Sequence, residues 1–291
     1  MSVAIIVNPL SGGVSPAKGR RRAEQASSVL AAAGEEGDVF VTDRRGHGHE
    51  LAAAAVRRGA RLVIAWGGDG TVNEVASALV GTSSSLGIVP SGSGNGLASE
   101  LGVDRRPERA ILEAIAAAPR LIDAGEMGGY FFFNMAGVGF DAHVAACFDR
   151  DHHQRRGFFT YAKVTAFEMW SYPSSTYRIG TRHARRALLV TVANSSQFGN
   201  GARVAPAARL DDGQLDVVVF EETSRLSAIA TIPRLFTGRF DKARGVSTWQ
   251  TDRTTIESEH PMTFHVDGEP LQGGTALDVR VHPLALRVNV R

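Results

Sequence analysis

The chain has 291 residues, of which 43% are hydrophobic and 21% are charged, and its formal net charge is +2. This composition is ordinary for a globular protein, and the length allows one large or two medium domains. A charge so close to neutral gives no bulk electrostatic support to a nucleic-acid partner, so none is expected. Cys147 is the only cysteine, which excludes a disulfide framework and a cysteine metal cluster.

The sequence indicates neither a secretory leader nor a membrane-spanning segment. The first ten residues read as a strand that enters a turn, without a basic leader or a long apolar core. No uninterrupted apolar run approaches the roughly 20 residues that span a bilayer. We therefore expect a soluble, cytoplasmic protein whose membrane contacts, if it makes any, are peripheral.

Strands and helices are predicted to alternate over the first part of the chain. The expected strands are 3–7, 38–42, 62–66 and 86–89, and the expected helices are 18–33, 50–58, from 72 onward, 98–101 and 109–118. Such alternation implies right-handed crossovers and a parallel sheet covered on both faces. We predict a doubly wound α/β domain over residues 1–122.

The pattern changes near residue 120, where strand-like segments begin to dominate. They lie at 130–134, 187–193, 215–220, 262–266, 276–281 and 284–290, with helical stretches near 141–149, 158–170 and 225–236. Several of these strands alternate apolar and polar residues, which is typical of half-buried antiparallel sheets. We predict a β-rich second domain over residues 123–291. Its last strand, near 284–291, either stays there or returns to the first domain.

The stretch 62–75 predicts a strand, a glycine turn and a helix. The turn contains glycines at positions 67, 68 and 70, where side chains would obstruct it. Thr71 is placed to cap the following helix. This arrangement offers backbone N–H groups and a partial positive charge to a phosphate. Asp69 would repel a phosphate, so we expect it to serve a metal ion or proton transfer; the alternative is an ordinary turn with a solvated aspartate.

Two more turns, 8–13 and 91–96, also follow predicted strands. The carboxyl ends of parallel strands lie on one edge of a sheet, where ligands bind. The three turns would surround a nucleoside triphosphate with backbone donors and with the side chains of Asn8, Thr42, Ser93 and Asn95. There is no Gly-Lys-Ser/Thr P-loop, so phosphoryl transfer would depend on a metal ion and arginines instead.

Motifs along nearly the whole chain resemble the diacylglycerol kinase catalytic-domain superfamily, which also holds sphingosine kinases, ceramide kinases and bacterial soluble lipid kinases. In the first half these motifs are Asn8-Pro9 with Ser11-Gly-Gly13, Gly67-Gly-Asp-Gly-Thr71 with Asn73-Glu74, and Pro90-Ser-Gly-Ser-Gly-Asn95. In the second half they are 134–141, 194–201, Ala205-Pro206, 210–216 and His265-Val-Asp-Gly-Glu269. They occur in the family's order and together are highly specific.

The resemblance implies an ATP- and Mg²⁺-dependent lipid kinase that transfers the γ-phosphoryl group to a lipid hydroxyl. The fold it implies is a nucleotide domain like that of NAD and diacylglycerol kinases, followed by an antiparallel β-sandwich-like domain for the lipid. The acceptor would be diacylglycerol, sphingosine or a related lipid presented at a membrane surface. Formation of a homodimer stays open.

The resemblance also assigns roles to individual residues. Those that would hold ATP are Asn8, Pro9, Ser11, Gly12, Gly13, Thr42, Gly67, Gly68, Asp69, Gly70, Thr71, Asn73, Glu74, Gly92, Ser93, Asn95 and Arg156. For Arg156 and its neighbour Arg155, a solvated pair of charges is the alternative. Asp212 would hold a structural magnesium with backbone carbonyls of Arg209 and Gln214, oxygen ligands that suit this ion; the alternative is a plain turn.

Two carboxylates are candidates for the catalytic base. Glu269 corresponds to the catalytic carboxylate of bacterial members, whereas Asp69 corresponds to the residue favoured in sphingosine kinases. We expect Glu269 to lie near the reacting groups and Asp69 to deprotonate the alcohol. Either would need to come within hydrogen-bond reach of the acceptor hydroxyl.

Three further interpretations stay open. Asp141 aligns loosely with an acid that could pair with a sphingoid amine, or it is a structural aspartate at a helix start. The aromatic stretch 158–170 could line an acyl-chain pocket or touch a membrane, or it is core. At the level of function, the alternatives are an NAD kinase-like enzyme, which shares the Gly-Gly-Asp-Gly-Thr core, and a non-catalytic nucleotide-binding module of the same fold.

Overall fold

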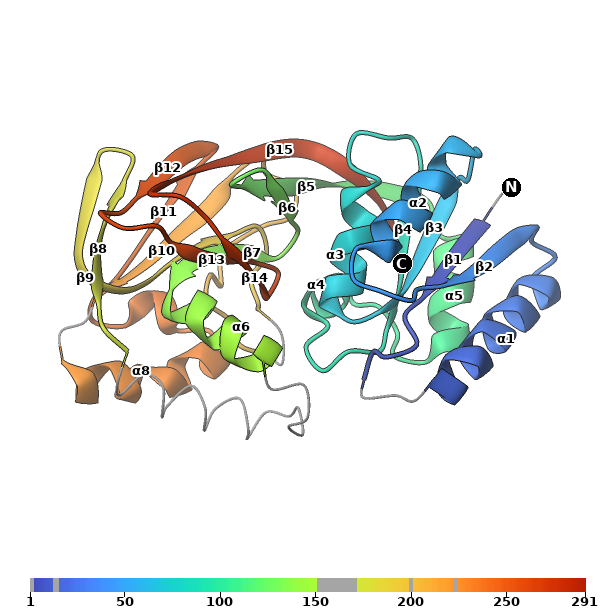
Figure 1. Cartoon of the computed structure of the whole chain (residues 1–291), viewed down its shortest axis with the longest axis horizontal. Coiled ribbons are helices and arrows are strands. Elements are labelled where there is room, and N and C mark those ends of the chain that lie inside the picture. Colours follow the sequence, from blue (N-terminus) through green and yellow to red (C-terminus); the bar gives the residue numbers. More distant parts are fainter. Residues whose placement is uncertain (1–2, 13–15, 151–171, 199–200, 222–223) are drawn as a thin grey trace. The chain divides into compact units, whose positions relative to one another are not determined.

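The computed structural model describes residues 3–12, 16–150, 172–198, 201–221 and 224–291. The chain forms two compact units, which are considered separately below (Figure 1). Unit 1 consists of Met1–Asp123 together with Leu284–Arg291, and unit 2 consists of Ala124–Pro283. The last stretch of the chain therefore belongs to the same unit as its beginning.

A parallel sheet forms the centre of unit 1. Its strands are β1 (Val3–Val7), β2 (Gly37–Val41), β3 (Leu62–Gly67), β4 (Ser85–Pro90) and the end of β15 (Ala276–Asn289), in the order β2-β1-β3-β4-β15. All four pairings are parallel. Every residue of β1 and β3 is buried, as the near-continuous apolar runs predict for a sheet covered on both faces.

The helices of unit 1 are α1 (Pro16–Ala32), α2 (His47–Arg57), α3 (Asp69–Ser77), α4 (Gly96–Glu100) and α5 (Pro107–Ala116). Residues of α1 and α5 pack with alternate residues of β1 and β3 in one buried apolar cluster. The last predicted helix of this unit corresponds to α5, which buries Ala110, Ile111 and Ala114. This is the doubly wound α/β arrangement that the alternating pattern predicts.

The predicted start of α3 is wrong. The helix begins at Asp69, two residues before Thr71, and its N-cap Gly68 has no capping side chain. Thr71 is buried inside the first turn, where its hydroxyl oxygen accepts a hydrogen bond of 2.9 Å from Asn8 Nδ2. Gly70 is likewise helical. The glycine turn is therefore shorter than the sequence suggests, because helical geometry extends back to the residue after Gly68.

Unit 2 is built around antiparallel strands. They are β6 (Tyr130–Phe132), β7 (Met135–Gly139), β8 (Ser175–Ile179), β9 (Arg182–Ala193), β10 (Leu215–Glu221), β11 (Val246–Thr251), β12 (Arg253–Glu257), β13 (Thr263–Val266) and β14 (Glu269–Gln272). The order is β14-β13-β7-β9-β8-β12-β15, and β10 lies between β9 and β11. β5 (Pro119–Met127), which starts in unit 1, pairs with β6 and β15. The β-rich character predicted for this half is confirmed.

In the part of unit 2 that the structure describes, two helices and a 3-10 turn accompany these strands: α6 (Phe140–Arg150), α8 (Arg225–Thr237) and η1 (Phe240–Lys242). They contribute to an apolar cluster that includes Phe140, Ala228 and Phe240. The helical stretch predicted at 158–170 lies outside the described residues. None of the helices that the structure describes has the length and apolar character needed to cross a bilayer.

The two strands predicted at 276–281 and 284–290 are one strand, β15. Its first part pairs with β12 in unit 2, and Arg287 and Val288 pair with Ser85 and Leu86 of β4 in unit 1. Between them, Leu284 has a positive φ of 50°. The sequence left the destination of this last strand open, and the pairing places it beside β4.

Candidate functional site

Three turns follow strands of unit 1 at one edge of its sheet. The strand ends are level, because Val7 pairs with both Val41 and Trp66, and Gly67 pairs with Pro90. The turns after β1, β3 and β4 therefore leave the sheet side by side, as predicted for parallel strands. Backbone bonds from Asn8 N–H to Trp66 and from Ser91 N–H to Gly67 continue the ladder into these turns.

The first turn is tied to its neighbours by side-chain hydrogen bonds. Asn8 Nδ2 donates to Thr71 of α3, and Asn8 Oδ1 accepts from the N–H of Leu10. The Ser11 and Ser91 hydroxyl oxygens lie 2.6 Å apart. A Cβ on Gly12 would stand 2.5 Å from the Ser91 carbonyl oxygen, and its φ is +75°. Glycine is required there by both close approach and backbone conformation.

The other two turns touch backbone to backbone. A Cβ added to Gly92 would lie 2.6 Å from the Cα of Gly68. The Asp69 carboxylate joins them, since Oδ2 accepts from the Asn95 N–H at 2.8 Å and Oδ1 from the Gly96 N–H at 2.7 Å. Asp69 thus holds the turn after β4 against the start of α3, a role that its position in the sequence did not reveal.

The side chain of Asn95 forms hydrogen bonds inside the turn after β4. It adopts a left-handed conformation with φ 52°. Its side chain accepts from the Gly92 N–H at 2.8 Å and donates to the Gly92 carbonyl oxygen at 2.7 Å. Ser93, at the tip of this turn, is exposed. The amide side chain of Asn95 therefore shapes the turn, while Ser93 is exposed to solvent.

The predicted nucleotide residue Glu74 faces α2. Its Oε1 accepts from the Gly46 N–H at 2.7 Å and its Oε2 from the Gly48 N–H at 2.9 Å. A negative charge at a helix N-terminus is favourable, so Glu74 fixes α2 against α3. Asn73, one residue earlier, accepts from the Ser77 hydroxyl at 3.4 Å. The Glu74 contacts thus join two helices, whereas the Asn73 contact lies within α3.

The remaining predicted nucleotide residues lie near the same edge or outside the described chain. Thr42 is buried directly after β2, and its N–H donates to the Val7 carbonyl oxygen. Pro9 packs on α1, where a Cβ on Gly19 would stand 2.3 Å from Pro9 Cβ. Gly13 and Arg156, with Arg155, lie outside the described residues.

Arg22 of α1 belongs to this edge, although the sequence did not single it out. Its Nη1 donates to the Asn8 carbonyl, the Ser11 carbonyl and the Ser11 hydroxyl at 3.1, 3.3 and 2.9 Å. Its guanidinium lies 5.9 Å from the centre of the Trp66 ring. Burial lowers the pKa of the Arg22 guanidinium. The sequence does not distinguish Arg22 from its neighbours, because it is the last of three consecutive arginines.

In unit 2, the candidate carboxylate Glu269 comes directly after the loop of a tight β-hairpin. Asp267 and Gly268, with φ of 48° and 86°, form the two-residue loop between β13 and β14. The Asp267 carboxylate accepts the N–H groups of Phe133, Asn134 and Met135 at 2.9, 2.8 and 3.2 Å. The Asp-Gly of the motif therefore anchors the hairpin, and the half-buried Glu269 begins the next strand.

Asp141 is held in a buried polar cluster. Its Oδ1 accepts from the Ala142 N–H at 2.8 Å, and its Oδ2 accepts from the Thr191 hydroxyl at 2.6 Å. The fully buried His265 places Nε2 3.3 Å from the same oxygen, while its Nδ1 accepts from the Gly268 N–H. These contacts match the structural interpretation of Asp141 at a helix start.

An apolar cavity of about 70 Å³ lies beside this cluster within unit 2. Asp141 and Thr191 supply its polar side, and the rest of its wall is apolar apart from Thr231. The apolar lining comes from several elements: Met135, Phe140, Val144, Leu189, Phe198, Ala202, Val204, Phe220, Ile232, Leu235 and Phe240. Such a wall suits a hydrocarbon chain.

The predicted magnesium residue Asp212 lies in an exposed turn before β10. Its Oδ1 accepts from the Gln214 N–H at 3.1 Å. Gln250 Nε2 lies 3.3 Å from Asp212 Oδ2 and 3.4 Å from Asp216 Oδ2, so one amide bridges two carboxylates. Burial raises the pKa of the Asp216 carboxyl; the hydrogen bond from Gln250 opposes this rise, and the charge of Asp212 adds to it. A pair of oxygen donors with this mutual repulsion suits a hard cation.

Arg209, the other predicted contributor to the metal site, is exposed and pairs with Asp211 at 3.3 Å. Only its backbone carbonyl was expected to serve the ion. Within the described ranges, no group of three or more His, Cys, Asp or Glu side chains could hold a metal. The predicted site, with one carboxylate and two carbonyls, is of a different kind, and Asp216 adds a second carboxylate beside it.

Two family models match this sequence. The diacylglycerol kinase catalytic domain matches residues 2–127, and the YegS C-terminal NAD kinase beta sandwich-like domain matches residues 134–290. A "probable lipid kinase YegS-like" of Chromohalobacter salexigens is 31% identical over 82% of this chain and 79% of its own length. A "probable lipid kinase YegS" of Salmonella arizonae is 29% identical over 90% of this chain and 89% of its own.

Solved structures share the fold. A putative diacylglycerol kinase from Bacillus anthracis superposes with a TM-score of 0.81 at 21% identity, covering 100% of this chain and 95% of that chain. A second structure from the same organism, also titled a putative diacylglycerol kinase, gives a TM-score of 0.80 at 20% identity. At these identities the likeness concerns the fold alone.

Proposed function

This chain belongs to the family of YegS-like lipid kinases with a diacylglycerol kinase catalytic domain, and from that premise we propose that it transfers the γ-phosphoryl group of ATP to a lipid hydroxyl. The observation that carries the proposal is the joined pair of glycine turns. Asp69 binds the turn after β4 to the start of α3, at the carboxyl edge of a parallel sheet. Ligands bind at that edge in open α/β sheets.

The phosphates of ATP would lie against the start of α3 and the turn after β1. The first N–H groups of a helix have no intrahelical acceptor and carry a partial positive charge. The first backbone bond of α3 runs from the Val72 N–H to Gly68, which leaves the N–H groups of Gly70 and Thr71 to face a ligand. Arg22 would add a full positive charge, and its burial would strengthen that interaction.

We propose Glu269 as the general base and Asp69 as a positioning residue. Both oxygens of Asp69 already accept backbone N–H groups, so its carboxylate serves to hold the turn after β4 against the start of α3. Glu269 follows a hairpin that Asp267 anchors through three N–H groups. A base on a rigid hairpin can be held within hydrogen-bond reach of an acceptor hydroxyl.

Magnesium would have two places in this proposal. Bound with ATP, it would neutralise charge on the phosphates during transfer. In unit 2, Asp212 and Asp216, with backbone carbonyls of Arg209 and Gln214, would hold a structural ion. The shared Gln250 amide and the raised pKa of Asp216 support that assignment, because a cation would relieve the repulsion between the two carboxylates.

The acyl chain of the acceptor would enter the apolar cavity of unit 2. A cavity of about 70 Å³ holds only part of a chain, so its wall would have to open when lipid binds. Asp141 and Thr191 on the polar side could accept or donate hydrogen bonds to a head-group oxygen or nitrogen. Phosphate transfer to a panel of lipids distinguishes a glycerolipid acceptor from a sphingoid base.

The test is transfer of labelled γ-phosphate from Mg-ATP to a panel in mixed micelles. The panel holds diacylglycerol, monoacylglycerol, sphingosine, ceramide and phosphatidylglycerol, with NAD as a control. We expect label in one lipid class. Label in NAD alone would support the NAD kinase alternative and contradict the proposal. If the protein binds ATP but neither transfers label to any alcohol nor slowly hydrolyses ATP, the non-catalytic module would be favoured.

A further inference from the structure

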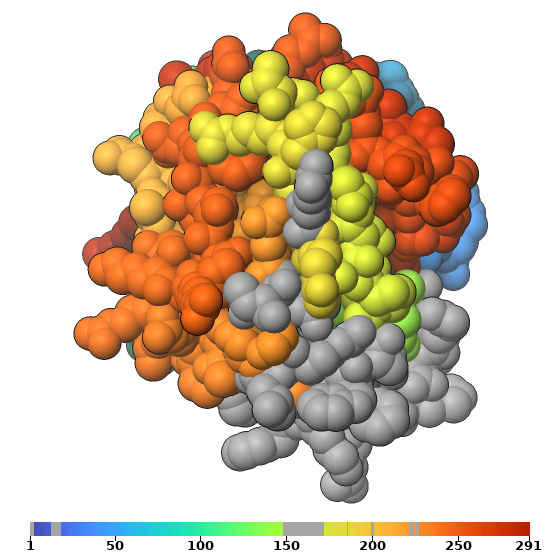
Figure 2. All heavy atoms as spheres, turned by 90° about the vertical axis from the view of Figure 1, so that its left-hand side faces the viewer, coloured from blue at the N-terminus to red at the C-terminus, as the bar shows by residue number. Residues whose placement is uncertain are grey.

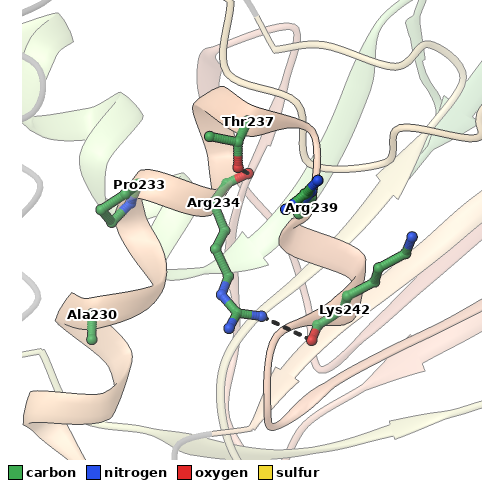
Figure 3. Close-up of a pocket in the computed structure, with 6 residues that line it drawn as sticks. All are labelled: Ala230, Pro233, Arg234, Thr237, Arg239 and Lys242. Carbon is green, nitrogen blue, oxygen red and sulfur yellow. Dashed lines mark hydrogen bonds between the residues drawn. The ribbon is translucent and has the colours of Figure 1, made fainter.

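The helix α8 has two faces of opposite chemistry. Thr231, Ile232 and Leu235 line the apolar cavity described above. The other face, with Ala230, Pro233, Arg234 and Thr237, lines an open groove of about 440 Å³ together with Arg239 and Lys242 (Figure 3). One helix therefore separates the cavity that suits a hydrocarbon chain from a basic groove at the surface.

The groove carries three positive side chains from two elements. Arg234 comes from α8, Arg239 precedes η1, and Lys242 ends it. All three side chains are exposed. Arg234 Nη1 donates to the Lys242 backbone carbonyl at 2.9 Å, which fastens η1 to α8 (Figure 3). The placement of the charges is thus fixed by the fold.

Negative charge is scarce around this groove. None of the six lining residues is acidic. Asp241 lies in the same 3-10 turn, but its Oδ1 is buried without a hydrogen-bond partner among the described residues. Arg203 approaches from the side, since a Cβ on Gly238 would stand 3.6 Å from its Cδ. Like charges gathered at one place repel one another, and an anionic partner would offset that cost.

The side chains do not converge on one point. In Figure 3, Arg234 and Lys242 point in different directions across the groove, and Ala230 and Pro233 form an apolar border. In Figure 2, which views the side of the molecule that carries α8, the orange spheres of α8 and the chain after it lie at the surface. Spread charges beside an apolar border fit a broad anionic surface better than a single phosphate ion.

We propose that this groove docks unit 2 onto anionic membrane lipids, with Arg234, Arg239 and Lys242 facing the head groups. The inference rests on the proposed function, because an enzyme that takes a lipid acceptor must meet a bilayer. Docking through the outer face of α8 would bring its inner face, which lines the apolar cavity, close to the acyl chains. Pro233 inside the helix removes one backbone bond, so the last turn of α8 can yield at a lower cost.

The experiment compares vesicle binding by the full chain and by two double variants. Arg239→Glu with Lys242→Glu reverses two charges of the groove and keeps Arg234, whose bond to the Lys242 carbonyl is structural. The control is Arg105→Glu with Arg120→Glu, two exposed arginines of unit 1. Both doubles carry the same net charge. Binding is measured by co-sedimentation with vesicles of phosphatidylcholine alone and of equal parts phosphatidylcholine and phosphatidylglycerol.

We expect the wild-type chain and the control to bind only the mixed vesicles, with an affinity that falls as salt rises. The groove variant should bind them at least about 25-fold more weakly, since each basic residue near an anionic surface contributes roughly fivefold. Equal binding by all three proteins would overturn the proposal. Loss in both doubles alike would also overturn it, because net charge alone would then account for the attraction.

Two further measurements separate this proposal from its alternatives. Titration with inorganic phosphate tests for a site for a soluble anion; phosphate binding that the groove variant loses, with vesicle binding unchanged, would contradict membrane docking. Kinase activity in uncharged micelles tests the proposed function separately, and the groove variant should match wild type there. If the groove variant melts early, Arg239→Gln with Lys242→Gln replaces it and should weaken vesicle binding in the same direction.

Discussion

At the scale of single residues, Arg22 is a half-buried cation whose hydrogen-bond partners are two carbonyls and a hydroxyl. No carboxylate of the described residues forms an ion pair with it. Buried charges are usually paired, because leaving water is costly for them. Burial lowers the pKa of this guanidinium, and a phosphate bound as proposed above would supply the missing anion.

Replacing Arg22 with Met should therefore separate ligand binding from stability. The free energy of unfolding without ligand should change by less than about 1 kcal/mol, since the lost hydrogen bonds are offset by removal of an unpaired charge. ATP affinity should fall about tenfold or more. Melting curves with and without ATP measure both effects, and Arg20→Met, an exposed neighbour, is the control. An unchanged ATP-dependent shift would remove Arg22 from the nucleotide site.

Asp69→Asn should lower both activity and stability. Asparagine keeps one acceptor oxygen, so the N–H of either Asn95 or Gly96 would meet an amide NH₂ instead of a carboxylate. Hydrogen bonds to charged acceptors contribute about 1.5–3 kcal/mol, and denaturant unfolding of Asp69→Asn should show a loss of about 2 kcal/mol in stability.

Glu269→Gln, by contrast, should abolish phosphoryl transfer with little change in stability. If instead Asp69→Asn kept wild-type stability and lost all transfer, Asp69 would be the better candidate for the base.

The proposed magnesium site at Asp212 can be tested by replacing Asp212 and, as a control, its neighbour Asp211. Because burial and the Asp212 charge raise the pKa of Asp216, ionised Asp216 lowers stability at neutral pH, and this penalty disappears as the pH falls. Asp212→Asn should therefore be at least as stable as wild type in chelator, yet gain less stability from magnesium. Asp211→Asn should respond to magnesium like wild type. Identical magnesium responses in all three proteins would argue against an ion at this turn.

At the scale of elements, the turns after β3 and β4 form one structure because glycines let their backbones meet. A Cβ on Gly92 would stand 2.6 Å from Gly68 Cα, with no flexible side chain that could yield. Gly92→Ala should destabilise unit 1 by about 2 kcal/mol, the usual cost of overpacking, and weaken ATP binding. Gly274→Ala, whose nearest neighbours are 4.0 Å away, should do neither. Unchanged stability in Gly92→Ala would contradict the close approach, and unchanged ATP binding would remove this turn from the proposed nucleotide site.

At the scale of the whole molecule, the chain returns to unit 1 after completing unit 2. Leu286 and Val288 are fully buried, and Asn289 Nδ2 donates to the carbonyls of Ala114 and Ala117 at 2.9 and 3.0 Å. The Gly81 N–H donates to the Ala285 carbonyl oxygen. Residues 284–291 thus extend the sheet beside β4 and bind carbonyl groups at the end of α5.

Deleting residues 284–291 should unfold unit 1. The loss of two buried aliphatic side chains and the hydrogen bonds of a strand approaches the total stability of a domain, about 5–15 kcal/mol. We expect the truncated chain to lose ATP binding and its cooperative melting transition, whereas deletion of the exposed Arg291 alone should have no effect. A truncated chain that binds ATP and melts like wild type would show that residues 284–291 are dispensable for unit 1.

The sequence by itself determined the fold class, the family and the order of the motifs. Burial on both faces demands continuous apolar strands such as 62–66, and close backbone approach demands glycines, so both leave a direct trace in the residues. The tertiary structure alone decided that Asp69 and Glu74 bind backbone N–H groups of other elements, that Arg22 lies against the turn after β1, and that β15 returns to β4. Those facts depend on contacts between residues distant along the chain, and local patterns carry no record of which distant group a side chain will meet.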